Sequence, residues 1–164
     1  MKKIWGVAIV AFTLLSCEKD DICAGEESVT PNVVINLFDR LDTEALKPAA
    51  KIAIIANGFT DTLFFTNQSK IDLPLQINTN ETIWNVVLYL PTVNNDTLFK
   101  KDQLKFTYTP EALYVSKACG YKTIFHDFNA VKIANTTGDE WIQSIYKLTN
   151  EITNNENTHI QLYY

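Results

Sequence analysis

The stretch Thr82-Ile-Trp-Asn-Val-Val-Leu-Tyr-Leu90 is the longest mainly apolar run between residues 32 and 164, and it decides the fold class. Its β-branched and aromatic side chains favour a strand, and its length makes it the best candidate for the centre of a sheet. Further along, residues 104–109 alternate between apolar and polar types. Leu104, Phe106 and Tyr108 are therefore expected to face a core. The two patterns together predict an all-β domain.

Other short apolar runs, separated by Asn, Asp, Gly and Pro, extend this pattern in both directions. They cover residues 32–38, 51–56, 59–66, 71–77, 113–116, 121–126, 131–134 and 159–164. The pair Asn57-Gly58 is a strong hairpin signal, and Pro74 places its run at a sheet edge or in a bulge. Closely spaced short strands are typical of a sandwich or a barrel. We favour a single antiparallel β-sandwich, immunoglobulin-like or related, over residues 32–164.

One segment, residues 139–149, is compatible with two structures. Helical spacing relates Trp141, Ile142, Ile145 and Leu148, and Thr137 with Glu140 fits a capping box. The segment is short and precedes a turn and a strand, so a hairpin competes. We favour a strand here.

The N-terminus has the organisation of an export signal. Lys2 and Lys3 precede twelve mainly apolar residues, 4–15, too few to cross a bilayer but typical of a signal-peptide core. The run ends in Leu14-Leu-Ser-Cys17, which resembles the lipobox of bacterial lipoprotein signals. The resemblance implies removal of residues 1–16 and lipidation of Cys17, whose acyl chains would anchor the protein. The alternative is an ordinary secretory signal, with Cys17 an incidental thiol.

An acidic segment follows Cys17. The cluster Glu18-Lys-Asp-Asp21 resembles the export signal that sends lipoproteins of the Bacteroidetes group to the cell surface. It implies a lipid-anchored location at the outer membrane, with the outward face favoured over the periplasmic one. Residues 17–31 as a whole are expected to be an acidic tether, and the alternative for the cluster is that it only keeps this tether solvated.

Lipidation of Cys17 would leave two cysteines, Cys23 and Cys119. An exported protein meets an oxidising compartment, so the even number predicts one disulfide rather than two free thiols. Closure of so long a loop would stabilise the fold by about 4 kcal/mol if the entropic model holds.

The charge balance argues against one class of partner. Without Lys2 and Lys3, the mature chain has 12 basic against 19 acidic side chains. Because nucleic-acid binding needs an excess of cations, we expect no nucleic-acid partner.

No catalytic, metal or cofactor motif is recognisable, so we expect a protein that is not an enzyme. His126 and Asp127 would point to opposite faces of a strand and could not share a metal. His126 and His159 are both expected to be surface or edge residues. The serines lack the context of a nucleophile elbow, and the paired carboxylates are neighbours in turns or in the tether.

Aromatic residues make up 12% of the chain, which raises the question of a stacking platform for sugar or peptide. Candidates are Trp84, Tyr89, Tyr108, Tyr114, Tyr121, Trp141, Tyr163 and Tyr164. On strands such residues more often fill the core or pair across strands. We favour that interpretation, with the terminal Tyr163-Tyr164 pair as the exposed exception.

Two repeated triplets suggest a modification. Asp61-Thr-Leu63 and Asp96-Thr-Leu98 resemble the O-glycosylation acceptor pattern of Bacteroidetes envelope proteins. The resemblance implies glycans on Thr62 and Thr97.

The chain as a whole resembles a small uncharacterised family of Bacteroidetes lipoproteins. The resemblance rests on residues 17–23, residues 30–39, Ala118-Cys-Gly-Tyr-Lys122 and the terminal residues 159–164. It implies an envelope location and pairing of Cys23 with Cys119, and it brings no activity. We therefore expect a lipid-anchored, non-enzymatic domain that binds or supports another envelope component. The alternatives are a carbohydrate- or peptide-binding module and an envelope hydrolase without a recognisable motif.

Overall fold

The computed structural model describes residues 23, 29–92, 96–134 and 136–164. The chain forms two compact units. The larger contains residues 30–112 and 123–164, and the smaller includes, among the described residues, Cys23, Val29 and residues 113–122.

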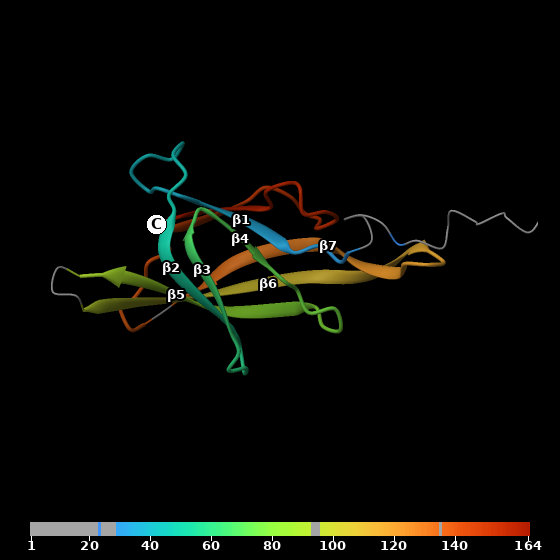
Figure 1. The fold of residues 1–164 in the computed structure, drawn as a ribbon, viewed down its shortest axis with the longest axis horizontal. Coiled ribbons are helices and arrows are strands. Elements are labelled where there is room, and N and C mark those ends of the chain that lie inside the picture. The colour runs from blue at the N-terminus through green and yellow to red at the C-terminus, as the bar shows by residue number, and fades with distance from the viewer. Residues whose placement is uncertain (1–22, 24–28, 93–95, 135) are drawn as a thin grey trace, which may run out of the picture. The chain divides into compact units, whose positions relative to one another are not determined.

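The larger unit is a sandwich of two β-sheets, which confirms the predicted fold class. One sheet has the strand order β4-β1-β9-β8 and the other has the order β3-β2-β5-β6-β7. In Figure 1, β1 and β4 lie in the upper layer and β5 and β6 in the lower one. The strands are β1 (Val33–Phe38), β2 (Ala49–Ala56), β3 (Thr62–Gln68), β4 (Lys70–Leu73), β5 (Glu81–Pro91), β6 (Thr97–Ser116), β7 (Gly120–Ile133), β8 (Ser144–Lys147) and β9 (Ile160–Tyr163).

The five-stranded sheet confirms the two patterns that predict the fold. Strand β5 is central and pairs with β2 and β6. On β6, Leu104, Phe106 and Tyr108 are at most 3% exposed, as the alternation predicts. The hairpin between β2 and β3 turns at Asn57-Gly58, where Gly58 has a φ of +83°. A positive φ suits glycine because it has no Cβ.

The four-stranded sheet includes one pairing that departs from a wholly antiparallel arrangement. Strand β1 pairs antiparallel with β4 but parallel with β9. Parallel neighbours need a long connection, and here nearly the whole domain lies between the two strands. Strand β4 is an edge strand that ends just before Pro74, as the proline predicts.

The ambiguous segment 139–149 is extended and contains β8. Its conformation is held by Asp102 of β6, whose Oδ2 accepts the backbone N–H groups of Trp141 at 2.7 Å and Ile142 at 2.8 Å. Trp141 and Ile142 are buried, at 5% and 1% exposure. A side chain from a distant strand therefore decides the conformation of this segment.

Strand β7 corrects two predictions. The run 131–134 is not a separate strand, because its first residues end β7. Asp127 has a φ of +51°, which interrupts the alternation. Asp127 and His126 bind Thr109 and Glu111 of β6, which lie two residues apart and thus on one face. The expectation that the side chains of His126 and Asp127 point to opposite faces is therefore wrong.

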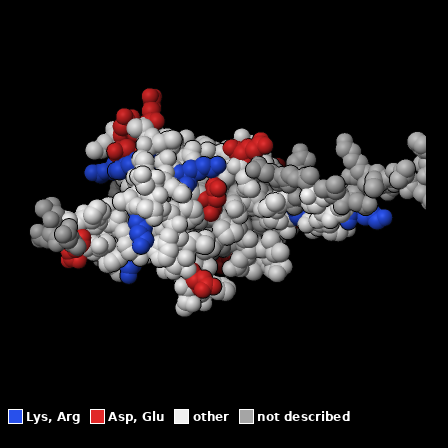
Figure 2. Space-filling view, in the orientation of Figure 1, with Lys and Arg blue, Asp and Glu red and all other residues white. Residues whose placement is uncertain are grey.

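The described residues include no helix long and apolar enough to cross a membrane. On the face shown in Figure 2, acidic and basic side chains are interspersed, with wide uncharged areas between them.

Candidate ligand-binding site

Three aromatic side chains lie next to one another on the outer face of the four-stranded sheet. Leu37 and Leu162 are core residues, so Phe38 of β1 and Tyr163 of β9 point outward by alternation. The rings of Phe38 and Tyr163 stack with centroids 5.3 Å apart. Tyr146 of β8 meets Tyr163 edge-on, with centroids 5.5 Å apart and planes at 87°. We call Phe38, Tyr163 and Tyr146 the aromatic row.

A surface hollow of about 570 Å³ adjoins this row. Its lining residues are Arg40, Leu41, Thr43, Gln143, Ser144, Tyr146 and Tyr163. They come from the loop after β1, from β8 with the residue before it, and from β9. All of them belong to the larger unit.

The loop that carries Arg40 is held to the sheet by its backbone. The N–H of Arg40 donates to the carbonyl of Tyr164 at 3.2 Å, and the N–H of Asp39 donates to that of Ala45 at 3.0 Å. The carboxylate of Asp39 accepts the N–H of Leu41 at 2.9 Å and lies 3.7 Å from the ammonium group of Lys47. The acid next to Arg40 therefore already has a cationic partner.

The polar groups of the hollow retain unused donors. Arg40 is the only arginine of the chain, and its guanidinium has no hydrogen-bond or ion-pair partner among the described residues. Within the same part of the chain, the side chains of Thr43, Gln143 and Ser144 are also without hydrogen-bond partners. A guanidinium, an amide, hydroxyls and aromatic rings can together bind a polar ligand with an apolar face.

The structure confirms the core aromatic residues of the prediction and corrects its exposed exception. Trp84, Trp141 and Tyr108 are buried, as core residues should be. Tyr163 and Tyr164 are half-buried rather than exposed, so the terminal pair is not the exposed exception that the sequence predicts. The hydroxyl of Tyr164 donates to the carbonyl of Lys47 at 3.2 Å, and burial raises the pKa of this hydroxyl to about 12. The most exposed tyrosines are Tyr121 (70%), Tyr146 (58%) and Tyr114 (56%).

A second group of aromatic residues lies on the outer face of the five-stranded sheet. The ammonium group of Lys51 lies 4.5 Å from the ring centroid of Phe64 and 4.9 Å from that of Tyr89. Tyr89 meets Phe99 edge-on at 4.9 Å. We call these four residues the lysine–aromatic row. Its cation is already shared between two rings of the same sheet.

The two histidines do not form a catalytic pair. The Nε2 atom of His126 lies 2.7 Å from Glu111, and its Nδ1 atom lies 3.3 Å from Glu151. The hydrogen bond with Glu151, followed by that with Glu111, raises the pKa of His126. Because carboxylates occupy both ring nitrogens, neither is left to take a proton from a nucleophile.

His159 corrects the prediction that both histidines lie at the surface or a sheet edge. It is 2% exposed, and its Nδ1 accepts the N–H of Val34 at 2.9 Å. His159 is buried because it directly precedes β9, which lies beside β1. Its own backbone N–H donates to the carbonyl of Val34 in β1 at 2.9 Å. Burial lowers the pKa of the imidazole. No group of three or more metal-ligating side chains occurs within the described ranges.

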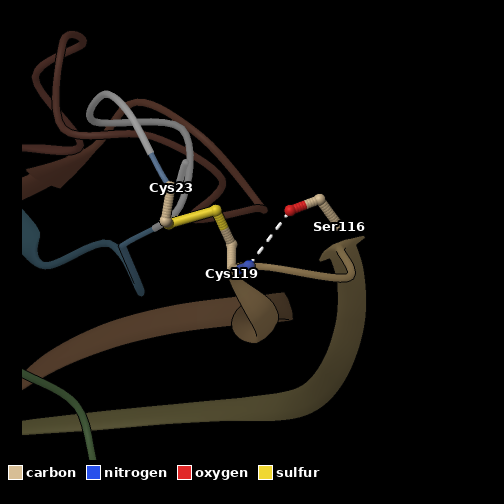
Figure 3. The surroundings of a disulfide bond; sticks show 3 residues. All are labelled: Cys23, Ser116 and Cys119. Carbon is tan, nitrogen blue, oxygen red and sulfur yellow. Dashed lines mark hydrogen bonds between the residues drawn. A yellow bond between two sulfur atoms is a disulfide. The ribbon is translucent and has the colours of Figure 1, made fainter. Parts of the chain in front are cut away.

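The smaller unit contains the disulfide between Cys23 and Cys119, with Cα atoms 5.0 Å apart (Figure 3). This is the pairing that the cysteine count predicts. The backbone N–H of Cys119 donates to the hydroxyl of Ser116 at 3.0 Å, and the rings of Tyr114 and Tyr121 meet edge-on at 5.4 Å. Cys17, the expected site of lipidation, lies outside the described residues, as do the signal segment 1–16 and the acidic cluster 18–21.

The two candidate glycosylation sites begin strands β3 and β6. Thr97 is exposed, and its backbone N–H donates to the carboxylate of Asp96 at 2.8 Å. Thr62 is half-buried, and its hydroxyl donates to the carbonyl of Thr60 at 3.3 Å. Thr97 is therefore the more accessible acceptor, and modification of either residue stays a prediction.

These features describe a two-sheet β-sandwich with a disulfide and a polar, aromatic-lined hollow. Residues 51–164, well over half of the chain, match a family of unknown function (DUF6452), and the chain belongs to this family. Tyr146 and Tyr163 lie within the matched segment, whereas Phe38 and Arg40 precede it. No curated protein matches the chain, and no solved structure does.

Proposed function

We propose that this protein is a lipid-anchored, non-enzymatic binding protein of the bacterial outer membrane. The observation that carries the proposal is the hollow beside the aromatic row, where the Arg40 guanidinium has no partner among the described residues. A protonated guanidinium, an amide and two hydroxyls can orient a ligand through hydrogen bonds. A guanidinium stays protonated at physiological pH, so it serves binding better than proton transfer.

The sequence supports the location. The lipobox-like segment ending at Cys17 implies two acyl chains on the mature N-terminus, which suffice for a stable anchor. The acidic cluster after Cys17 favours the outward face of the outer membrane. A domain held there by its N-terminus would meet other envelope proteins and glycans, which are the partners we propose.

The anchor is tested by the intact mass of the protein extracted with detergent from its native membrane. We expect the mass of residues 17–164 plus acyl chains, with a gain of two hydrogens when the Cys23–Cys119 bond is reduced. Hexose-sized increments lost in a Thr62→Ala or Thr97→Ala variant would locate glycans. A mass without acyl chains, found for protein in the soluble fraction, would contradict the proposed location.

Binding is tested by crosslinking in intact cells, followed by recovery of the full-length protein. The double variant with Arg40→Gln and Tyr146→Ala should no longer crosslink to the envelope component. A matched control, Phe64→Ala on the opposite face, should retain it. Equal recovery from both variants would show that the hollow is not the binding site.

A further inference from the structure

The hollow has two kinds of surface that suit a sugar ring. Tyr146 is 58% exposed and stands nearly perpendicular to Tyr163, at 87°. The hollow is therefore bordered by two rings of different orientation, which can contact the C–H groups of a pyranose. Exposed aromatic side chains with a polar tip suit ligands that are partly apolar and partly hydrated.

The hydrogen-bonding groups fit several hydroxyls rather than one anchoring group. Gln143 and Ser144 are consecutive, and the N–H of Gln143 donates to the carbonyl of Tyr163 at 2.9 Å. This bond fixes the backbone and leaves the two side chains at the hollow. Together with Thr43 of the loop, they supply both donors and acceptors, as a ring bearing several hydroxyls requires.

The cation narrows the ligand class. Asp39 is paired with Lys47, so the guanidinium of Arg40 is not neutralised by the acid beside it. The Oδ1 atom of Asp42, in the same loop, accepts the N–H of Glu44 at 3.3 Å, and neither acid lines the hollow. A guanidinium presents a planar pair of N–H donors that matches a carboxylate. A ligand with a carboxylate would complement it better than a neutral one.

We infer that the hollow binds a carboxylate-bearing sugar, with its ring against Tyr146 and Tyr163 and its carboxylate on Arg40. This inference rests on the proposed binding function and names its ligand class. A peptide is the weaker fit, because Leu41 is the single aliphatic side chain among the residues that line the hollow.

The test uses full-length protein in detergent and matched pairs of oligosaccharides. The probes are trimers of galacturonate, glucuronate and mannuronate, each compared with its carboxyl-reduced, neutral counterpart by calorimetry. We expect at least one acidic trimer to bind about 10- to 100-fold more tightly than its neutral counterpart, the range for a charge-assisted hydrogen-bonded pair. Arg40→Gln should abolish that difference, and Tyr146→Ala should weaken both members of the pair.

The control is Lys51→Met, which removes a cation from among aromatic rings on the opposite face and should leave the difference unchanged. Equal affinity for the acidic and neutral trimers would overturn the inference while leaving the binding function intact. The inference would also be overturned if no trimer binds but a peptide with a free C-terminal carboxylate binds and its amide does not. If none of these probes binds, and if the double variant and the Phe64→Ala control above both retain the crosslinked component, then the inference and the proposed binding function are both overturned.

Discussion

On the outer face of the five-stranded sheet, the Lys51 ammonium lies 4.5 Å and 4.9 Å from the ring centroids of Phe64 and Tyr89. On the outer face of the four-stranded sheet, the Arg40 guanidinium lines a hollow with Tyr146 and has no partner among the residues that the structure describes. Each face thus places a cation near aromatic rings. The cation of the first face interacts within the fold, whereas that of the second remains available to a ligand.

The histidines extend this contrast between the sheets. His126, on β7 of the five-stranded sheet, binds two carboxylates at the surface. His159, next to β9 of the four-stranded sheet, is buried against β1. The difference teaches that residue type does not separate a stabilising group from a binding group. What separates them is whether the fold already supplies the partner.

The largest effect should come from Asp102 of β6, which binds the segment that leads into β8 of the other sheet. It is 2% exposed and accepts the N–H groups of Trp141 and Ile142, just before the hollow residues Gln143 and Ser144. Asp102→Ala leaves both buried N–H groups without an acceptor, whereas Lys132 keeps the carboxylate of Glu140 at 3.3 Å. We expect about 2–6 kcal/mol of destabilisation in urea unfolding, since each of the two buried donors left unsatisfied costs about 1–3 kcal/mol.

Asp102→Asn is the matched control, because its amide oxygen still accepts backbone N–H groups. It should cost less than the alanine variant and keep the hollow functional. If the two variants lost equal stability, the hydrogen bonds to 141 and 142 would not be the cause, and the link between the sheets would lie elsewhere.

The next effect is a pH dependence set by His159 on the four-stranded sheet. Burial lowers its pKa from the ordinary 6.5, so the unfolded chain takes up the proton more readily than the folded one. The contribution of His159 is therefore complete above about pH 6.5. It is lost as the pH falls from there toward the folded pKa. Urea midpoints measured from pH 8 to pH 5 should decline on the acid side.

His159→Leu separates this contribution from other acid-sensitive groups. It leaves the N–H of Val34 without an acceptor, which should cost about 1–3 kcal/mol at pH 8. It should also flatten the acid-side decline. A variant with an undiminished decline would assign the pH dependence to carboxylates instead.

Periodicity predicts the five-stranded sheet because the relevant information is local. The run 82–90 becomes the central strand β5, and alternation over 104–109 places Leu104 and Phe106 in the core. The parallel pairing of β1 with β9 has no such local pattern, since the partners Ile35 and Ile160 are separated by most of the domain. Pairing of this kind depends on the whole topology.

The candidate site was not predictable for the same reason. Arg40 lies in a polar loop, and Gln143 and Ser144 follow a segment whose conformation depends on Asp102 of a distant strand. Of the residues that line the hollow, the sequence pattern indicates only Tyr163, and the two members of the terminal tyrosine pair have different roles. Tyr163 lines the hollow, whereas the hydroxyl of Tyr164 donates a hydrogen bond to the carbonyl of Lys47. The one sequence signal for this site is that Arg40 is the only arginine in the chain.

A smaller effect should distinguish the two cations. Lys51→Met removes the interaction with two rings and should cost about 0.5–1 kcal/mol, as for an exposed cation–π contact. Arg40→Gln removes no interaction among the described residues and should stay within about 0.5 kcal/mol of the parent. Both are measured by urea unfolding at pH 7. A larger cost for Arg40→Gln would mean that its guanidinium already serves the fold, and the contrast between the faces would fail.

The smallest effect concerns His126, whose exposed cluster has the opposite pH sign to His159. Hydrogen bonds with Glu151 and Glu111 raise its pKa above 6.5, against desolvation, which lowers it. Its contribution is therefore present below about pH 6.5 and is lost as the pH rises through the folded pKa. An NMR titration should show the raised pKa directly. Glu151→Gln and Glu111→Gln should each lower it, and the double variant should lower it furthest. If the pKa stayed raised in the double variant, Asp127, the next acid along β7, would be the group to test, because its positive φ brings its side chain to the same face.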